Sequence, residues 1–496
     1  MERKNAWKTY RDADVAALET LARDYIDFIS ENKTERECAT AAIARAEACG
    51  YQNLETLRRA GTQLRAGDKV WAHAYGKALV LVHVGTAPFE QGFNILGAHI
   101  DSPRLDIKQN PLYETNGLAL LDTHYYGGIK NYQWVTTPLA IHGVIVKKTG
   151  EVVQVNVGED ASDPVFCVTD LLPHLARQQM GKKASEAIEG DELDILVGSR
   201  PALTADDIAA RDGAVAKTAA DGVVAAAADA EATKKTEAEK LAEKEPVKAL
   251  LLQLLADKYG VEEEDFLSAE LEVVPAGRAR ECGFDRSMVL GYGQDDRVCA
   301  FTSLAAQLKA HDLVRTGVCV LVDKEEIGSV GATGMASMFF ENTVAEVMAL
   351  AGETGNLALR RALAASNMLS SDVSAAFDPS YAFAYEAKNA AFCGKGLVFN
   401  KFTGSGGKSG SNDANAEYMA KIRRIMDEGK VNFQTAELGK VDVGGGGTIA
   451  YIPAKYGMNV IDSGVAVLSM HAPWEVTSKA DIYEAFKGYQ VFLREA

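Results

Sequence analysis

The stretch "VCVLVDKEEIGSVGATG", residues 318–334, indicates the fold class of this chain. Its first five residues are apolar and mostly β-branched, which is typical of a strand that is buried on both faces of a parallel sheet. Glu325 and Glu326 follow this run at the place where open α/β sheets bind ligands, the carboxyl ends of their strands. Adjacent carboxylates repel each other there unless a proton or a cation lies between them. The stretch therefore predicts an α/β fold with a metal site at a strand end, although an exposed acidic turn is the alternative interpretation of this stretch alone.

Other residues of the types that bind metals also follow apolar runs. These residues are His99 and Asp101 in "FNILGAHID", Asp295 and Asp296 in "MVLGYGQDDR", Asp372 in "NMLSSDVS" and His471 in "GVAVLSMHAP". Two imidazoles and several carboxylates suit a pair of divalent ions such as Zn²⁺, with Co²⁺ or Mn²⁺ as alternatives. Because alternate residues of an extended chain point the same way, Asp101 is placed to hydrogen-bond the far nitrogen of His99.

Composition and charge exclude several classes of function. With 496 residues the chain is long enough for two domains. Its net charge of −17 is unfavourable for binding nucleic acid or an anionic membrane surface, so we expect neither as a partner. The N-terminal stretch has no apolar core of a signal peptide, and no apolar run is long enough to span a membrane, so we expect a soluble cytoplasmic protein.

The seven cysteines show no paired C-x-x-C spacing and predict no thiolate zinc site. We therefore expect them to be reduced and to serve mainly in packing. Any metal in this chain must accordingly be held by His, Asp and Glu side chains.

The pattern along the chain predicts a discontinuous α/β domain, residues 1–108 and 270–496, in which apolar strand-like runs alternate with helical stretches. Residues 109–269 are rich in strand-like runs and glycine turns and predict an inserted domain. Within it, residues 202–258 are rich in Ala, Glu and Lys and favour helix, with Pro246 as a helix start.

Four motifs carry a resemblance to a known family: "GAHIDSPRLDIK", "DKEEIGS", "DVSAAFDPSY" and "SMHAPWE". In type and order they resemble the motifs of the aspartyl aminopeptidase family of cocatalytic zinc metallopeptidases, in particular its bacterial branch of probable aminopeptidases. The resemblance implies a zinc-exopeptidase-like catalytic domain, with a mixed β-sheet flanked by helices, and an inserted β-rich domain that serves in dimerisation and as a lid. It also implies two zinc ions per chain and a homo-dodecamer built from dimers.

The resemblance assigns a role to each of these residues. Glu325 is implied as the general base and Asp101 as the residue that orients His99, and the Asp295–Asp296 peptide bond is implied to be cis. Asp295 is implied to bridge the two metals, and the terminal ligands are implied to be His99, Glu326, Asp372 and His471.

The implied reaction is removal of the N-terminal residue from a peptide with a free amino terminus, by attack of a metal-bridging water. Lys401 and Lys408 are candidates for recognising an acidic first residue. Because the segment around them departs from the family pattern, the sequence leaves open whether the preferred first residue is acidic. Two alternatives also stay open: a metal-dependent deacylase on the same scaffold, and a catalytically silent scaffold that self-assembles.

Overall fold

The computed structural model describes residues 4–203, 207 and 237–496. The chain forms two compact units. The first unit comprises Met1–Pro103, Tyr126–Ile129 and Gly277–Ala496, and the second comprises Arg104–Tyr125 and Lys130–Ala276. Of the helical segment expected at 202–258, residues 204–206 and 208–236 lie outside the described residues.

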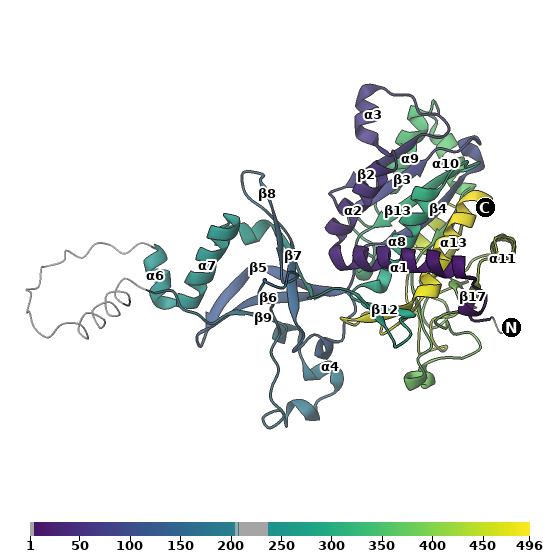
Figure 1. Cartoon of the computed structure of the whole chain (residues 1–496). Helices are drawn as coiled ribbons and strands as arrows, with labels where there is room; N and C mark the ends of the chain where they lie inside the picture. Colours follow the sequence, from purple (N-terminus) through teal and green to yellow (C-terminus); the bar gives the residue numbers. More distant parts are fainter. Residues whose placement is uncertain (1–3, 204–206, 208–236) are drawn as a thin grey trace, which may run out of the picture. The chain divides into compact units, whose positions relative to one another are not determined.

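A nine-stranded mixed sheet forms the centre of the first unit, and in Figure 1 its strands β2, β3, β13 and β4 lie side by side. Strand β13 pairs in parallel with β4, and β4 pairs in parallel with β14, so these three strands end at the same edge. The strands, in their order across the sheet, are β1 (Gln52–Asn53), β2 (Lys69–Ala74), β3 (Ala78–His83), β13 (Thr316–Val322), β4 (Phe93–His99), β14 (Asn367–Ser370), β18 (Asn459–Gly464), β16 (Leu397–Asn400) and β17 (Phe433–Ala436).

Both faces of this sheet are buried, as the continuous apolar run of β13 predicts. Cys319 and Leu321 belong to the hydrophobic core on one face, whereas Val318, Val320 and Val322 belong to the core on the other. The first core is completed by helices α1 (Asp12–Glu31), α2 (Glu35–Ala48), α8 (Gln294–Lys309), α11 (Ala416–Glu428) and α13 (Lys479–Glu495). The second core is completed by helices α3 (Leu54–Ala60), α9 (Phe339–Leu350), α10 (Asn356–Ala364) and α12 (Tyr451–Ala454).

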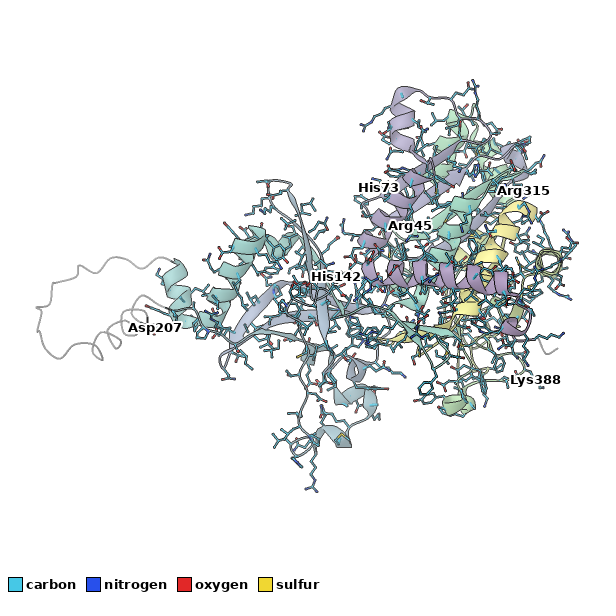
Figure 2. All side chains as sticks on the ribbon, in the orientation of Figure 1. Arg45, His73, His142, Asp207, Arg315 and Lys388 are labelled. Atoms are coloured by element: carbon cyan, nitrogen blue, oxygen red, sulfur yellow. The ribbon has the colours of Figure 1, made fainter. Side chains whose placement is uncertain are left out.

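A capping box sets the start of α2, and an ion pair with α1 helps to set its position. Thr34 accepts a hydrogen bond from the backbone N–H of Glu37, and the Glu37 carboxylate accepts one from the backbone N–H of Thr34, which is a capping box. Arg45, labelled in Figure 2, forms an ion pair with Asp24 of α1, with 2.8 Å between Nη2 and Oδ1. This pair joins two helices that cover the same face of the sheet.

A smaller five-stranded sheet also belongs to the first unit. Its strands, in order, are β11 (Arg280–Cys282), β12 (Met288–Gly291), β20 (Glu475–Ser478), β19 (Ala466–Leu468) and β15 (Ser374–Ala375). Strands β12 and β20 are antiparallel, and β20 is also antiparallel to β19. This sheet matters for the site because the chain leaves β12 and β19 toward two of the predicted metal ligands.

The second unit is built on a six-stranded sheet. Its strands, in order, are β8 (Val152–Val157), β7 (Leu139–Val146), β10 (Ala269–Pro275), β5 (Arg104–Thr115), β6 (Leu118–Tyr126) and β9 (Ile195–Gly198), and its helices are α4 (Ala184–Ala187), α6 (Glu237–Lys244) and α7 (Pro246–Tyr259). Helix α7 begins at Pro246, the residue expected from the sequence, and ends before Gly260, which has a left-handed backbone conformation. The Glu114 carboxylate accepts hydrogen bonds from the first N–H groups of this helix, at Val247 and Lys248.

The predicted α/β fold class with a mixed sheet flanked by helices is confirmed. The unit boundaries differ by a few residues from the predicted ones at 108 and 270, and Tyr126–Ile129 belongs to the first unit. Hydrogen bonds connect this short segment to the first unit, from the Tyr126 hydroxyl to Asp101 and between the His471 ring and the backbone carbonyl of Gly128. No helix among the described residues has the length and apolar character that a membrane span requires.

Candidate functional site

Three neighbouring parallel strands bring most of the predicted site residues together. His99 is the last residue of β4, Asp372 follows β14 by two residues, and Glu325 and Glu326 follow β13. Because these strands are adjacent and parallel, their carboxyl ends meet at one edge of the nine-stranded sheet. For these four residues, the structure has the arrangement that the sequence predicts, in which the side chains lie at the ends of strands.

Asp295 and His471 reach the same place from the smaller sheet. Asp295 lies at the start of α8, after β12, with non-helical backbone angles φ −81° and ψ 108°. The Asp295–Asp296 peptide bond is cis, as the family resemblance implied. His471 follows β19 and has a φ of +65°, in the left-handed region that a non-glycine residue rarely adopts.

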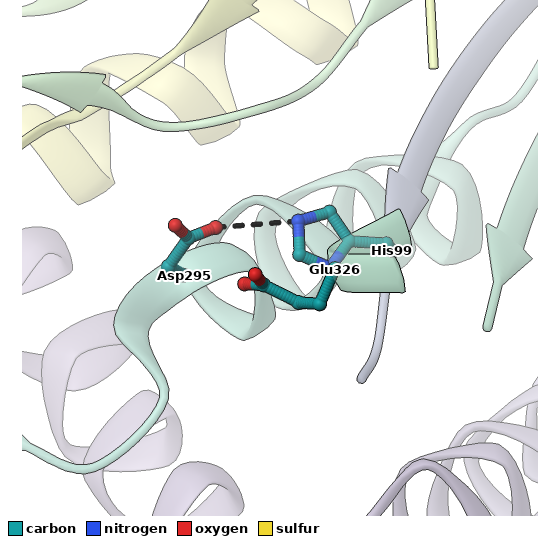
Figure 3. Close-up of side chains that lie close together, drawn as sticks. All are labelled: His99, Asp295 and Glu326. Atoms are coloured by element: carbon teal, nitrogen blue, oxygen red, sulfur yellow. Dashed lines mark ion pairs between the residues drawn. The ribbon is translucent and has the colours of Figure 1, made fainter. Parts of the chain in front are cut away.

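The Asp295 carboxylate lies between the two histidines. Its Oδ1 is 3.2 Å from Nε2 of His99, and its Oδ2 is 3.2 Å from Nε2 of His471. Figure 3 shows Asp295 and His99 facing each other, with the Glu326 side chain beside them. The Oε2 of Glu326 is 3.6 Å from Nε2 of His471. Each oxygen of the Asp295 carboxylate therefore faces a different imidazole.

Among the residues that the structure describes, two groups of side chains have a spacing that could hold a metal ion. His99, Asp295 and Glu326 form one group, and the ligand atoms of its members lie within 4.8 Å of one another. His99, Asp296 and Asp372 form the other group, with the same spacing. The sequence places Asp296 after an apolar run but assigns it no role, and the structure brings it beside Asp372.

The burial of several carboxyl groups in the cluster favours a bound cation. Burial raises the pKa values of Asp372, Asp296 and Glu326 well above the usual range for carboxyls. Burial lowers the pKa of His471, but the hydrogen bond to Asp295 and the negative charges of Glu326 and Asp295 together outweigh burial and raise that pKa to about 10. Among the described residues, no group donates a hydrogen bond to the buried Oε1 of Glu326 or Oδ1 of Asp296. Buried carboxylate oxygens without donors are costly, and a divalent cation would satisfy them.

Asp101 connects the ligand-bearing loops. Its carboxylate accepts hydrogen bonds from the backbone N–H groups of Glu325 and Glu326, both at 3.2 Å, and from the Tyr126 hydroxyl at 2.8 Å. Its Oδ1 also lies 3.3 Å from Nδ1 of His99. These contacts fix the ring of His99 and the turn after β13 relative to each other, and the role of Asp101 in orienting a metal ligand stays a prediction.

Glu475 makes a corresponding connection on the other side of the site. Its Oε2 accepts a hydrogen bond from the backbone N–H of Asp295 at 3.1 Å, and its Oε1 accepts one from the backbone N–H of His471 at 2.7 Å. The side chain is 1% exposed, so water does not compete for these bonds. Glu475 therefore holds the two predicted ligands that come from the smaller sheet.

Glu325 is placed differently from its neighbour. Its Oε2 lies 3.9 Å from Nε2 of His99, and it belongs to neither of the two ligand groups. Burial raises the pKa of its carboxyl to about 7, and the nearby carboxylates contribute to the rise. A carboxylate with a pKa near neutrality beside a metal-binding group has the properties of a general base.

A pocket of about 500 Å³ opens beside the cluster and is lined by Asp295, Glu325, Glu326, Asp372 and His471 together with nearby loops. The two lysines predicted to bind substrate do not line it. Lys401 and Lys408 instead form ion pairs with Asp413, the latter with 3.0 Å between Nζ and Oδ2. Their role in substrate binding stays a prediction.

The sequence analysis missed the residues that hold the cluster from outside. Tyr126 contacts Asp101, which is 25 residues away in sequence. Glu475 contacts Asp295, which is 180 residues away, and His471, which is four residues away. The only signal for Glu475 is its place four residues after His471 in "SMHAPWE". For Tyr126 we find no local signal.

Comparison with known proteins identifies the family. A family model described as aminopeptidase I zinc metalloprotease (M18) matches residues 28–493. The chain belongs to the M18 family. This M18 peptidase is 57% identical over 492 residues to the probable M18 family aminopeptidase 1 of Clostridium acetobutylicum, an alignment that covers 99% of this chain and 98% of the relative. The predicted family and the aminopeptidase class of hydrolase are confirmed, and neither the deacylase nor the silent scaffold is supported.

Solved structures support the same family. The M18 peptidase matches the crystal structure of an M18 aminopeptidase from Thermotoga maritima with a TM-score of 0.87 and 38% identity, covering 100% of both chains. It also matches the structure of the S. cerevisiae mApe1 dodecamer with a TM-score of 0.71 and 20% identity, covering 95% of each chain. At that identity the second likeness shows the fold alone.

Proposed function

We propose that this M18 aminopeptidase removes the first residue of peptides with two zinc ions held by His99, Asp295, Glu326, Asp372 and His471. The observation that carries the proposal is the position of Asp295, because each of its oxygens lies 3.2 Å from a different histidine. A carboxylate that binds through both oxygens is the usual bridge in a two-metal site. The other proposed ligands lie on either side of this bridge.

The residues present fit zinc in number and kind. Two imidazoles and three carboxylates are ligands that zinc accepts, and no cysteine is needed. The unsatisfied carboxylate oxygen of Glu326 and the raised pKa values of Glu326 and Asp372 support a cation at this place. When bound, zinc would polarise the scissile carbonyl and make water a stronger nucleophile at neutral pH.

The roles of the neighbouring residues follow from their contacts. Glu325 is proposed to take a proton from the attacking water and to return it to the leaving amine, because its carboxylate lines the pocket without being needed as a ligand. Asp101 holds the His99 ring and the Glu325 backbone in place and thereby positions the base relative to the ligands. The unprotected amino terminus of the substrate would be bound by the acidic groups of the same pocket.

The test combines metal analysis with a panel of substrates. Protein purified without chelator should contain close to two zinc ions per chain, and it should hydrolyse leucyl p-nitroanilide but not the N-acetylated compound. A metal content near zero after reconstitution with zinc or cobalt would contradict the metal site. Equal release of p-nitroaniline from the N-acetylated compound would contradict the requirement for a free amino terminus, and release of acetate from it would instead indicate a deacylase.

We also propose that the second unit is an oligomerisation domain and that the chain assembles as a homo-dodecamer built from dimers. This proposal is supported by membership of the M18 family and by the solved structure of the mApe1 dodecamer, which has the same fold. Sedimentation should give a mass roughly twelve times that of the 53.1 kDa chain. An active monomer at micromolar concentration would contradict it.

We infer a cytoplasmic location. All seven cysteines lie among the described residues and none forms a disulfide, as in a reducing compartment. Lysis of cells directly into denaturant that contains an alkylating reagent, followed by mass spectrometry, would test the inference, since every cysteine should be recovered in its alkylated form.

A further inference from the structure

A second pocket in the first unit is lined by basic side chains. It has a volume of about 840 Å³, and it shares no lining residue with the pocket beside the metal cluster. The lining comes from parts of the segment 387–395, which precedes β16, from Arg423 of α11, and from residues 433–435 of β17, the last strand of the nine-stranded sheet. This basic pocket has no role in the proposed peptidase reaction.

The charge of the basic pocket is of one sign. Its lining includes Lys388, Lys395 and Arg423 and no carboxylate, and no carboxylate among the described residues forms an ion pair with any of the three. The next residue of the helix, Arg424, is different, because it pairs with Glu428 at 3.0 Å and does not line the pocket. Three neighbouring positive charges repel one another and attract an anion, although the chain as a whole has a net charge of −17.

Contacts with a buried side chain hold the shape of the basic pocket. The Gln434 side chain, which is 5% exposed, donates a hydrogen bond to the carbonyl of Phe392 and accepts one from its N–H, both at 2.9 Å. The Phe392 ring stacks on Phe377, with 5.2 Å between ring centres. The Lys395 ammonium lies 4.4 Å from the centre of the Phe392 ring, so the same residue positions this cation.

The other two cations are accessible to a ligand. Lys388, labelled in Figure 2, and Arg423 are both exposed. The acidic residue closest to Lys388 in sequence, Glu386, accepts a hydrogen bond from the Asn389 side chain at 3.0 Å and does not line the pocket. Thr435 also lines the pocket and is exposed, and its hydroxyl is able to donate a hydrogen bond to an anion.

We propose that the basic pocket binds a small organic anion that carries two or more phosphate groups. Three cations match the charge of such an anion, and the guanidinium of Arg423 has the fork geometry that suits phosphate oxygens. The volume is much larger than a single inorganic phosphate needs and lies in the range of pockets for metabolite-sized ligands. Ala387, Ala390 and Phe392 supply apolar surface for the body of the ligand.

Calorimetry on the full-length zinc-loaded protein tests the proposal, with ADP and fructose 1,6-bisphosphate as probes and adenosine as the uncharged counterpart. At least one of the two phosphates should bind with a Kd below about 1 mM, and adenosine should bind at least roughly 10-fold more weakly than ADP. Binding of the phosphates should weaken as salt is raised from about 0.05 M to about 0.5 M, because salt screens exposed charges.

The adjacent arginines of α11 provide a matched pair of variants. Arg423→Gln should weaken phosphate binding by roughly 10-fold or more, because it removes a charge-assisted contact. Arg424→Gln should leave the Kd within about twofold, because that side chain already pairs with Glu428 outside the pocket. Phosphate groups also bind zinc, but both variants keep the same metal site, so the difference between them reports on the basic pocket alone.

Lys388→Gln is an independent second variant and should weaken binding in the same direction as Arg423→Gln, and thermal unfolding checks that every variant is folded. Failure of both phosphates to bind below about 1 mM would overturn the proposal. Equal effects of Arg423→Gln and Arg424→Gln, or adenosine binding as tight as that of ADP, would overturn it as well. Tighter binding of a tetraglutamate peptide than of either phosphate would also overturn it and would assign the pocket to acidic peptides.

Discussion

Glu325 and Glu326 are adjacent in sequence, yet the structure predicts that their glutamine variants fail in different ways. Glu325 lies in the pocket, outside both ligand groups, with its Oε2 3.9 Å from Nε2 of His99. Glu325→Gln conserves size and hydrogen bonding but removes the proton acceptor. It should keep the zinc content and the KM of the unchanged protein while losing kcat by ~10²–10⁴-fold, the usual contribution of general acid–base catalysis. At about 1.36 kcal/mol for each factor of ten, this loss raises the activation barrier by about 2.7–5.4 kcal/mol.

Glu326→Gln is the matched control for this change. Glu326 belongs to the group with His99 and Asp295, and its Oε2 lies 3.6 Å from Nε2 of His471. Removing its charge should weaken or empty one zinc position. Zinc content by plasma mass spectrometry and turnover of leucyl p-nitroanilide, measured on both variants, decide between the roles. Loss of zinc in Glu325→Gln with full zinc in Glu326→Gln would reverse the assignments, and full activity in both would refute the reasoning.

Three further predictions concern the same site. Glu475→Gln should weaken zinc binding by roughly 10–100-fold in a competition titration with a chelator, because an amide accepts only one of the two N–H bonds from Asp295 and His471; unchanged affinity would show that these bonds are dispensable. Removal of zinc with a chelator should lower the unfolding temperature and reloading should restore it, since the buried carboxylates lose their cation; an unaltered unfolding temperature would argue against a buried metal site. As the pH is lowered, activity should fall around a pKa of about 7 or below, because Glu325 must be ionised to accept a proton and bound zinc favours that ionised form. An acid limb of the pH profile centred well above pH 7 would exclude Glu325 as the base.

The strand-end sites were predictable from local pattern. The run from Val318 to Val322 is apolar throughout, and such runs form strands buried on both faces in parallel sheets. His99, Asp372 and the two glutamates follow such runs directly, so the general rule for open sheets places them at one edge. These residues converge because β13, β4 and β14 are neighbours in the sheet. The general rule places ligands at strand ends but does not specify which strands are neighbours.

The remaining contacts depend on pairings that no local pattern encodes. Asp295 and His471 come from a second sheet, and their meeting requires β12 and β19 to lie on either side of β20. The Tyr126 hydroxyl bonds to the side chain of Asp101, and the Glu475 carboxylate to the backbone of Asp295, both far away in sequence. The ion pairs of Lys401 and Lys408 with Asp413 were likewise not expected, because charge pairs across a loop depend on the conformation of that loop.

The most direct test of the metal centre is an anomalous difference map, collected on both sides of the zinc absorption edge, from crystals of protein purified without chelator. The proposal predicts two zinc peaks per chain, one on each side of the Asp295 carboxylate, with His99 beside one peak and His471 beside the other. A single peak away from Asp295, or no peak in crystals of active enzyme, would contradict the assignment of this cluster as the catalytic metal site.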